Sequence, residues 1–137
     1  PATNSAWRTL FGWNQASGPY SGIQFATTGN GRMIARMGND TTDYYTTNRP
    51  DGDGRWHMLS ASRDTSGIQR VYFDGVRQVA YSVQVSIGAN HHLYLGRSFR
   101  PNSYSLNEHF RGALDDVRIY GRALTDEEIR SLWANSP

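Results

Sequence analysis

Residues 110–133 read FRGALDDVRIYGRALTDEEIRSLW and carry the clearest structural signals of the chain. Leu114, Val117 and Ile119 supply the apolar positions of a half-buried strand, although two adjacent carboxylates interrupt the strict alternation. We therefore predict a strand over residues 114–119, followed by a turn and a helix.

The helix start is marked by Thr125, which stands three residues before Glu128. At this spacing the hydroxyl and the carboxylate each accept a hydrogen bond from the other residue's backbone N–H. Ile129, Leu132 and Trp133 then follow at i, i+3 and i+4, so the helix has one apolar side. Because the rest of the chain shows strand patterns and no second helix pattern, we expect this side to pack on a sheet.

Two hairpins are predicted upstream of this region. The stronger spans residues 69–81 around Asp74-Gly75, since Asp-Gly supplies the two positive φ angles of a type I′ turn. The other joins residues 22–27 to residues 32–37 through a Gly-Asn-Gly turn. Further strands are predicted at residues 7–13, 56–63, 83–87 and 92–96.

Short strands at regular intervals, Gly-rich turns and a single late helix predict an all-β fold, an antiparallel two-sheet β-sandwich of the jelly-roll type. The 137 residues fit one domain, residues 1–137. The candidate core aromatic residues are Trp7, Phe11, Trp56 and Phe73.

Composition excludes several classes of function. All fourteen basic residues are Arg, the net charge is only +2, and no basic run exists, so we expect no nucleic-acid partner. The absence of Cys excludes disulfides, a thiolate nucleophile and Cys-ligated zinc. No apolar stretch approaches the roughly 20 residues that span a bilayer, so we expect no membrane insertion.

Catalytic motifs are also missing. Glycosidases on jelly rolls place carboxylates two residues apart on one strand, whereas Asp115 and Asp116 are consecutive. Glu127 and Glu128 fall in the first helical turn, where they favour the helix dipole. The four His residues are dispersed, without zinc-motif spacing. We therefore expect a protein that is not an enzyme.

Residues 112–129 resemble the C-terminal signature of the laminin G-like, concanavalin A-like lectin-glucanase jelly-roll modules. Residues 53–57 (DGRWH), 71–75 (VYFDG) and 93–96 (LYLG) are similar to the same family in the same order. The resemblance implies the sandwich fold already predicted from the strand pattern. The family usually begins with further strands, including an Asp-bearing F-D-G segment, which have no counterpart before Trp7. We expect a trimmed sandwich, or an edge completed by a neighbouring chain or domain.

A calcium site is implied by this resemblance, in which the Asp at the position of Asp115 often helps to bind calcium. Asp115 and Asp116 at a bulge aim two carboxylates outward together, and calcium prefers oxygen ligands. The alternative is that both carboxylates accept hydrogen bonds from backbone N–H groups and Arg side chains. Asp51 and Asp53 offer a weaker alternative site, for which turn formation is the better interpretation.

Carbohydrate binding, as a lectin-like or adhesion module, is the function that the resemblance implies. Aromatic rings stack on sugars, and planar polar groups bond their hydroxyls. Two loops carry side chains of this character, and the candidate ligand-binding residues are Tyr44, Tyr45, Asn48, Arg49, Asn102, Tyr104 and Asn107.

The second hypothesis is a structural domain that decorates a virion, fibre or cell-surface complex without a sugar ligand. The aromatic start formed by Trp7, Phe11 and Trp13 is typical of an edge that needs a partner. The partner is then a neighbouring protein subunit or domain instead of a glycan. Both hypotheses place the protein outside the cell or on a virion surface.

Overall fold

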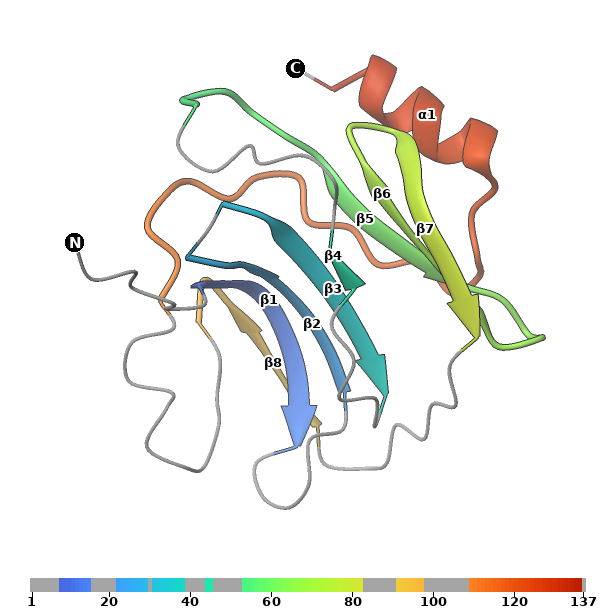
Figure 1. Cartoon of the computed structure of the whole chain (residues 1–137), viewed down its shortest axis with the longest axis horizontal. Coiled ribbons are helices and arrows are strands. Elements are labelled where there is room, and N and C mark those ends of the chain that lie inside the picture. The colour runs from blue at the N-terminus through green and yellow to red at the C-terminus, as the bar shows by residue number, and fades with distance from the viewer. Residues whose placement is uncertain are drawn as a thin grey trace.

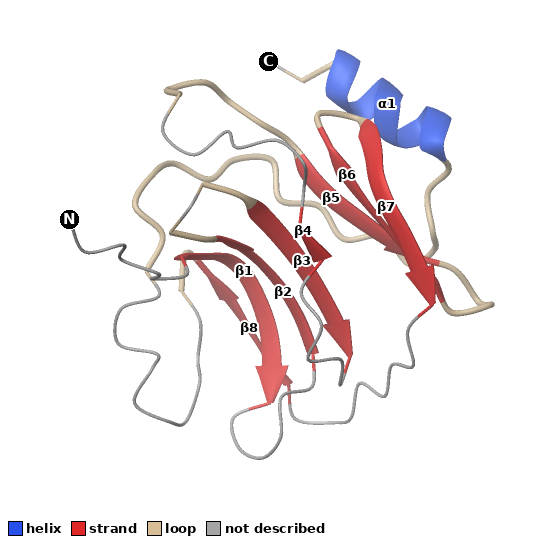
Figure 2. Cartoon of the chain, viewed as in Figure 1, coloured by secondary structure: helices blue, strands red, loops and turns tan. Residues whose placement is uncertain are grey.

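Two antiparallel sheets and one C-terminal helix make up the fold (Figures 1 and 2). This arrangement confirms the predicted two-sheet sandwich. No helix among the described residues is long and apolar enough to cross a membrane. The structure is a computed structural model, and it describes residues 8–15, 22–29, 31–38, 44–45, 53–82, 91–97 and 109–136.

The larger sheet has the strand order β4-β3-β2-β1-β8. Its β2–β3 hairpin pairs Gly22 with Gly38 and Thr27 with Met33, which confirms the predicted hairpin. Every neighbouring pair in this sheet is antiparallel. The strands are β1 (Arg8–Gln15), β2 (Gly22–Thr27), β3 (Met33–Gly38), β4 (Tyr44–Tyr45) and β8 (His91–Leu95).

The smaller sheet has the order β5-β6-β7, and its centre is the second predicted hairpin. The φ angles of Asp74 and Gly75 are 49° and 73°, so both turn residues are left-handed, as a type I′ turn requires. The strand expected at residues 83–87 lies outside the described residues. The strands are β5 (Leu59–Arg63), β6 (Ile68–Phe73) and β7 (Val76–Ser82).

The helix α1 (Asp126–Ala134) begins with the predicted capping box. The Thr125 N–H donates to the Glu128 carboxylate at 2.9 Å, and the Glu128 N–H donates to the Thr125 hydroxyl at 3.2 Å. Arg122 adds two bonds to the same carboxylate, at 2.8 and 2.6 Å. The bonds from Arg122 and the Thr125 N–H lower the pKa of Glu128 to about 2, so the cap stays charged well into acid.

The helix packs against the β6–β7 turn, where Gly75 leaves no room for a side chain. A Cβ on Gly75 would stand 3.0 Å from the Cβ of Trp133 and 3.2 Å from the Cα of Arg130. On the same helix, Ile129 is 2% exposed. The buried apolar residues of the described chain are Ala26, Met33, Ile34, Ala35, Val71, Tyr72, Phe73 and Ile129.

The structure confirms one prediction about buried aromatic residues and contradicts another. Phe73 is buried, as predicted, but Trp56 is 57% exposed and is not a core residue. Trp56 follows the bend at residues 53–55 and precedes β5, so it lies outside the alternating pattern that buries side chains within a strand. Trp7 lies outside the described residues.

The predicted strand over residues 114–119 is wrong, because this segment pairs with no strand in the described structure. The side chains of Leu114, Val117 and Ile119, which were predicted to face the core, are 37%, 49% and 63% exposed. The extended conformation is interrupted at the two adjacent carboxylates, because the backbone of Asp116 is left-handed, with φ of 53°, and bends the chain.

We predict that Gly75→Ala destabilises the protein by about 2 to 3 kcal/mol, because the new methyl group meets both a left-handed backbone and the helix. Gly54→Ala is the matched control, since Gly54 has φ of +77° but open space around it, and should cost only about 1 kcal/mol. Urea denaturation measures both. Equal losses would show that the helix does not constrain the turn.

Candidate functional site

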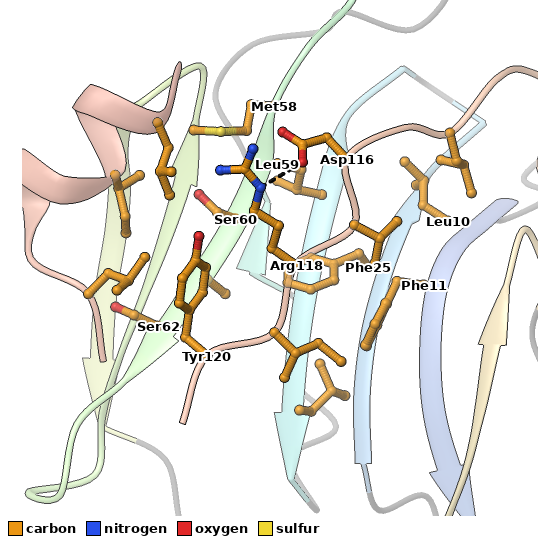
Figure 3. Close-up of a pocket in the computed structure, with 18 of the residues that line it drawn as sticks. Leu10, Phe11, Phe25, Met58, Leu59, Ser60, Ser62, Asp116, Arg118 and Tyr120 are labelled. Atoms are coloured by element: carbon orange, nitrogen blue, oxygen red, sulfur yellow. Dashed lines mark hydrogen bonds and ion pairs between the residues drawn. The ribbon is translucent and has the colours of Figure 1, made fainter. Parts of the chain in front are cut away.

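A cavity of about 800 Å³ opens between the two sheets (Figure 3). Its walls come from β1 and β2 on one side and from β5 on the other, with residues 114–122 and the helix closing the remainder. Ligand sites in proteins have volumes of roughly 300 to 1,000 Å³ and combine apolar walls with a few convergent polar groups. The cavity therefore has the size of a small-molecule site.

The wall formed by the larger sheet is apolar. Phe11 and Phe25 are direct cross-strand neighbours, with ring centroids 5.7 Å apart in an edge-to-face arrangement. Trp13 and Ile23 form the next same-face pair along these strands and also line the cavity. This wall offers rings and aliphatic groups but no charge.

Polar groups gather near β5 and the segment that faces it, as Figure 3 shows. The Arg118 Nε donates to Asp116 Oδ1 at 2.6 Å, and Tyr120 lies on the same segment. Ser60 faces this region with a buried hydroxyl oxygen that has no hydrogen-bond partner among the described residues. A buried hydroxyl without a partner is costly, so Ser60 marks a place where a further polar group fits.

Trp56 contributes an exposed ring to the lining of the same cavity. Sequence reasoning assigned it to the core and so missed it as a site residue. One signal was available: Trp56 directly follows a Gly-rich turn, where the period-two pattern that predicts burial has not yet begun. An exposed tryptophan beside a cavity is a ring free for stacking.

His57 holds the start of β5 in place. Its Nδ1 lies 2.9 Å from the Asp74 carboxylate and its Nε2 lies 3.0 Å from the Asp53 carboxylate. The imidazole also stacks on Phe73, with centroids 5.0 Å apart and an interplanar angle of 27°. His57 thus links the bend before β5 to the β6–β7 turn and fixes the chain next to Trp56.

These contacts change the pKa values of both partners. Burial of the imidazole alone would lower the pKa of His57, but hydrogen bonds to Asp74 and Asp53 outweigh it, so the pKa is raised above 6.5. The pKa of Asp53 falls to about 2, chiefly because its carboxylate accepts the Arg55 N–H, with His57 and the Arg55 side chain adding to the effect. The ion pair is complete when His57 is protonated and Asp53 is ionised.

The residues predicted to bind a ligand are only partly covered by the structure. Tyr44 and Tyr45 form β4, which pairs with Ala35 and Ile34 at one edge of the larger sheet. A polar loop was expected there, so the short strand is a correction to that expectation. The remaining predicted ligand residues lie outside the described residues: Asn48, Arg49, Asn102, Tyr104 and Asn107.

The predicted calcium ligands each have a hydrogen-bond donor in place. Asp115 Oδ1 accepts the Asp116 N–H at 2.7 Å, while Asp116 Oδ1 accepts Arg118 at 2.6 Å. Calcium takes six to eight oxygen ligands, and no group of three or more His, Asp or Glu side chains among the described residues could hold a metal ion. The described residues alone do not make a calcium site, and calcium binding stays a prediction.

Comparison with known protein families agrees with the observed two-sheet fold. A family model described as the concanavalin A-like lectin/glucanases superfamily matches residues 1–130. No curated protein sequence matches the chain.

Two solved structures are similar to this one. The CBM40 of the Ruminococcus gnavus IT-sialidase has a TM-score of 0.71 at 13% identity, over 96% of this chain and 76% of that chain. An S-layer domain-containing protein from Clostridium thermocellum (residues 221–444) has a TM-score of 0.48 at 18% identity, over 95% of this chain and 64% of that chain. At these identities the first comparison supports the fold alone.

We predict that the contribution of His57 to stability depends on pH. A raised pKa stabilises the folded state fully below 6.5, and this stabilisation is lost as the pH rises through the folded-state pKa. Asp53 is ionised in both the folded and the unfolded state above about pH 5, since its pKa of 3.8 is lowered further on folding. His57→Asn should therefore lower the free energy of unfolding more at pH 5.5 than at pH 8.5.

Chemical denaturation of His57→Asn at the two pH values measures this difference. His92→Asn is the control, because His92 is exposed on β8. A loss in His57→Asn that is the same at both pH values would contradict the ion-pair account.

Proposed function

Because the chain belongs to the concanavalin A-like lectin/glucanase superfamily, we propose that it is a non-catalytic carbohydrate-binding module with a lectin-like or adhesive role. One observation carries the proposal: the exposed ring of Trp56, the Tyr120 side chain and the Arg118–Asp116 pair line the same open cavity. The shared fold with a carbohydrate-binding module supports it.

The chemistry of these side chains suits a sugar. A pyranose has an apolar C–H face, which stacks on an indole or phenol ring, and a rim of hydroxyls that needs donors and acceptors. Trp56 and Tyr120 supply the rings, while Arg118 supplies planar N–H donors and Asp116 supplies acceptor oxygens. Asp116 keeps a second oxygen beyond the one that accepts Arg118, and that oxygen serves a ligand hydroxyl in this proposal.

A second contact region completes the proposed site on a larger glycan. It comprises β4 and the other polar residues singled out in the sequence, whose rings and amides resemble in character those of the cavity. Its residues are Tyr44, Tyr45, Asn48, Arg49, Asn102, Tyr104 and Asn107.

A structural role in a virion, fibre or cell-surface complex is the alternative, and one observation favours it. β8 is an edge of the larger sheet, and its Leu93 and Leu95 are each 50% exposed. An edge strand with exposed leucines is a surface that another chain can extend by strand pairing. In either role we place the protein outside the cell or on a virion surface.

We predict that the isolated protein binds specific sugars on a glycan array and that Trp56→Ala weakens the best binding by about tenfold or more. We expect the loss of one stacked ring to cost about 1.4 kcal/mol of binding free energy, which corresponds to a tenfold weaker affinity. Tyr94→Ala is the matched control, because it removes a ring of β8 that does not line the cavity. Titration calorimetry with the highest-ranked glycan measures both variants.

Three outcomes of this experiment contradict the proposal. Equal weakening by the two variants would move the binding site away from the cavity. Full binding by Trp56→Ala would do the same. Absence of any sugar binding, together with self-association on a sizing column, would support the structural alternative.

Calcium binding is tested separately, because it requires ligands beyond Asp115 and Asp116 from residues outside the described ranges. If calcium binds the folded state, millimolar calcium raises the melting temperature, and Asp115→Asn abolishes the increase. Magnesium at the same concentration is the control for ionic strength. An unchanged melting temperature would exclude the calcium site.

A further inference from the structure

The charged side chains that line the cavity determine which class of sugar it can hold. Hexose glycans are uncharged, whereas uronate glycans carry a carboxylate on each ring. Proteins bind carboxylates with guanidinium or imidazolium groups whose N–H donors are available to the ligand. In the described lining, the side chains that can carry a positive charge are His57, Arg63, Arg118 and Arg122. Their contacts therefore determine whether the site can bind an acidic sugar.

Arg118 is bound to a carboxylate of the same cavity lining. Its Nε donates to Asp116 Oδ1 at 2.6 Å, and Figure 3 shows this bond. The side chains of Arg118 and Asp116 are 49% and 44% exposed, so a ligand can reach the pair. A ligand carboxylate that approaches Arg118 therefore also meets the negative charge of Asp116.

Arg122 and Arg63 are engaged as well. The Arg122 guanidinium donates two hydrogen bonds to the Glu128 carboxylate, at 2.8 and 2.6 Å. Such a two-bond pair combines the charge and the planar geometry of both groups, which makes it strong. Arg63 also has an interaction partner, and it ends β5, at the opposite end of the strand from Trp56. Neither guanidinium is available to a charged sugar that stacks on Trp56.

His57 has a carboxylate at each ring nitrogen. Its Nδ1 lies 2.9 Å from the Asp74 carboxylate, and its Nε2 lies 3.0 Å from the Asp53 carboxylate. Protonation of the imidazole strengthens both contacts and leaves no ring N–H for a ligand. Each cation of the described lining thus already has a partner.

The carboxylates at the cavity outnumber the cation beside them. Asp115 Oδ1 accepts the Asp116 N–H at 2.7 Å, and Asp115 has no cationic partner among the described residues. Asp115, Asp116 and Arg118 together therefore present a negative charge to the cavity that they line. A ligand that brings a further negative charge to such a surface loses affinity, and the site discriminates against it.

Sugar hydroxyls fit the same groups without this penalty. A hydroxyl both donates and accepts, so it can donate to the second oxygen of Asp116 and accept from a further N–H of Arg118 while the ion pair stays intact. The buried Ser60 hydroxyl, which has no hydrogen-bond partner among the described residues, is an uncharged group for the same purpose. The polar side of the cavity thus favours hydroxyls over carboxylates.

We propose that the cavity selects uncharged glycans over acidic ones, and that Asp116 determines this selectivity by holding Arg118 in an ion pair. The inference rests on the carbohydrate-binding function proposed above and names the class of sugar for that same site. Asp116 acts twice, because it occupies the guanidinium that a ligand carboxylate needs and it repels that carboxylate.

Matched oligosaccharides test the selectivity. Oligosaccharides of glucose, mannose and galactose are compared with those of the corresponding uronic acids, which carry a carboxylate in place of a hydroxymethyl group. Calorimetric titration is done at about pH 7 and low ionic strength, where uronates are ionised and screening is weak. A metal chelator is present, because a bound cation would neutralise Asp115 and Asp116. We expect the neutral member of each pair that binds to bind at least about tenfold more tightly than its uronate.

Asp116→Asn tests the assigned residue. Asn keeps the size of the side chain and tolerates the left-handed backbone, with φ of 53°, but it carries no charge and releases Arg118. We expect this variant to bind the uronates about tenfold more tightly than the native protein does. Glu127→Gln is the matched control, because it removes a negative charge from an exposed residue that does not line the cavity. It should leave the preference for neutral sugars unchanged.

Three results would overturn the proposal. Equal or tighter binding of the uronates by the native protein would remove the selectivity and leave the carbohydrate-binding function standing. An unchanged preference in Asp116→Asn, or the same change in Glu127→Gln, would show that Asp116 does not determine the selectivity. Binding of neither class would overturn the proposed function and the selectivity with it.

Discussion

The Asp74-Gly75 turn is the constraint on which the smaller sheet and the helix depend. The Asp74 N–H donates to the Met58 carbonyl at 2.9 Å, and the Asp74 carboxylate accepts the Met58 N–H at 2.9 Å and contacts His57. Its neighbour Gly75 lets Trp133 approach to a distance that a side chain would block. One two-residue turn thus joins the β6–β7 hairpin, the start of β5 and the C-terminal helix.

The geometry of the candidate site depends on the Asp74-Gly75 turn. Because His57 and Met58 are fixed by Asp74, the residue before them, Trp56, is held next to the cavity with its ring exposed. The opposing wall, made by Phe11 and its neighbours on β1 and β2, belongs to the other sheet. Residues 114–122 also line the cavity but pair with no strand in the described structure, and they carry the Arg118–Asp116 pair of the site.

Features set by local chemistry could be predicted from the sequence. The Asp74-Gly75 turn and the cap between Thr125 and Glu128 depend on residues at most a few positions apart, and the structure contains both. The strand at residues 114–119 was mispredicted, because its sequence favours a strand but a strand also needs a pairing partner, and the backbone of Asp116 is left-handed. The exposure of Trp56 was also mispredicted: the Gly-rich turn before it was a local signal, but the extent of its exposure depends on how the two sheets meet.

The central claim is that a glycan binds in the cavity between the sheets, where β5 and residues 114–122 line it. Amide chemical-shift mapping during titration with the highest-ranked glycan tests it most directly. The account predicts that the largest shifts fall in residues 53–63 and 114–122, which line the cavity or lead into it. Shifts confined to β4 and the sequence-predicted loops, or the absence of shifts at saturating glycan, would contradict it.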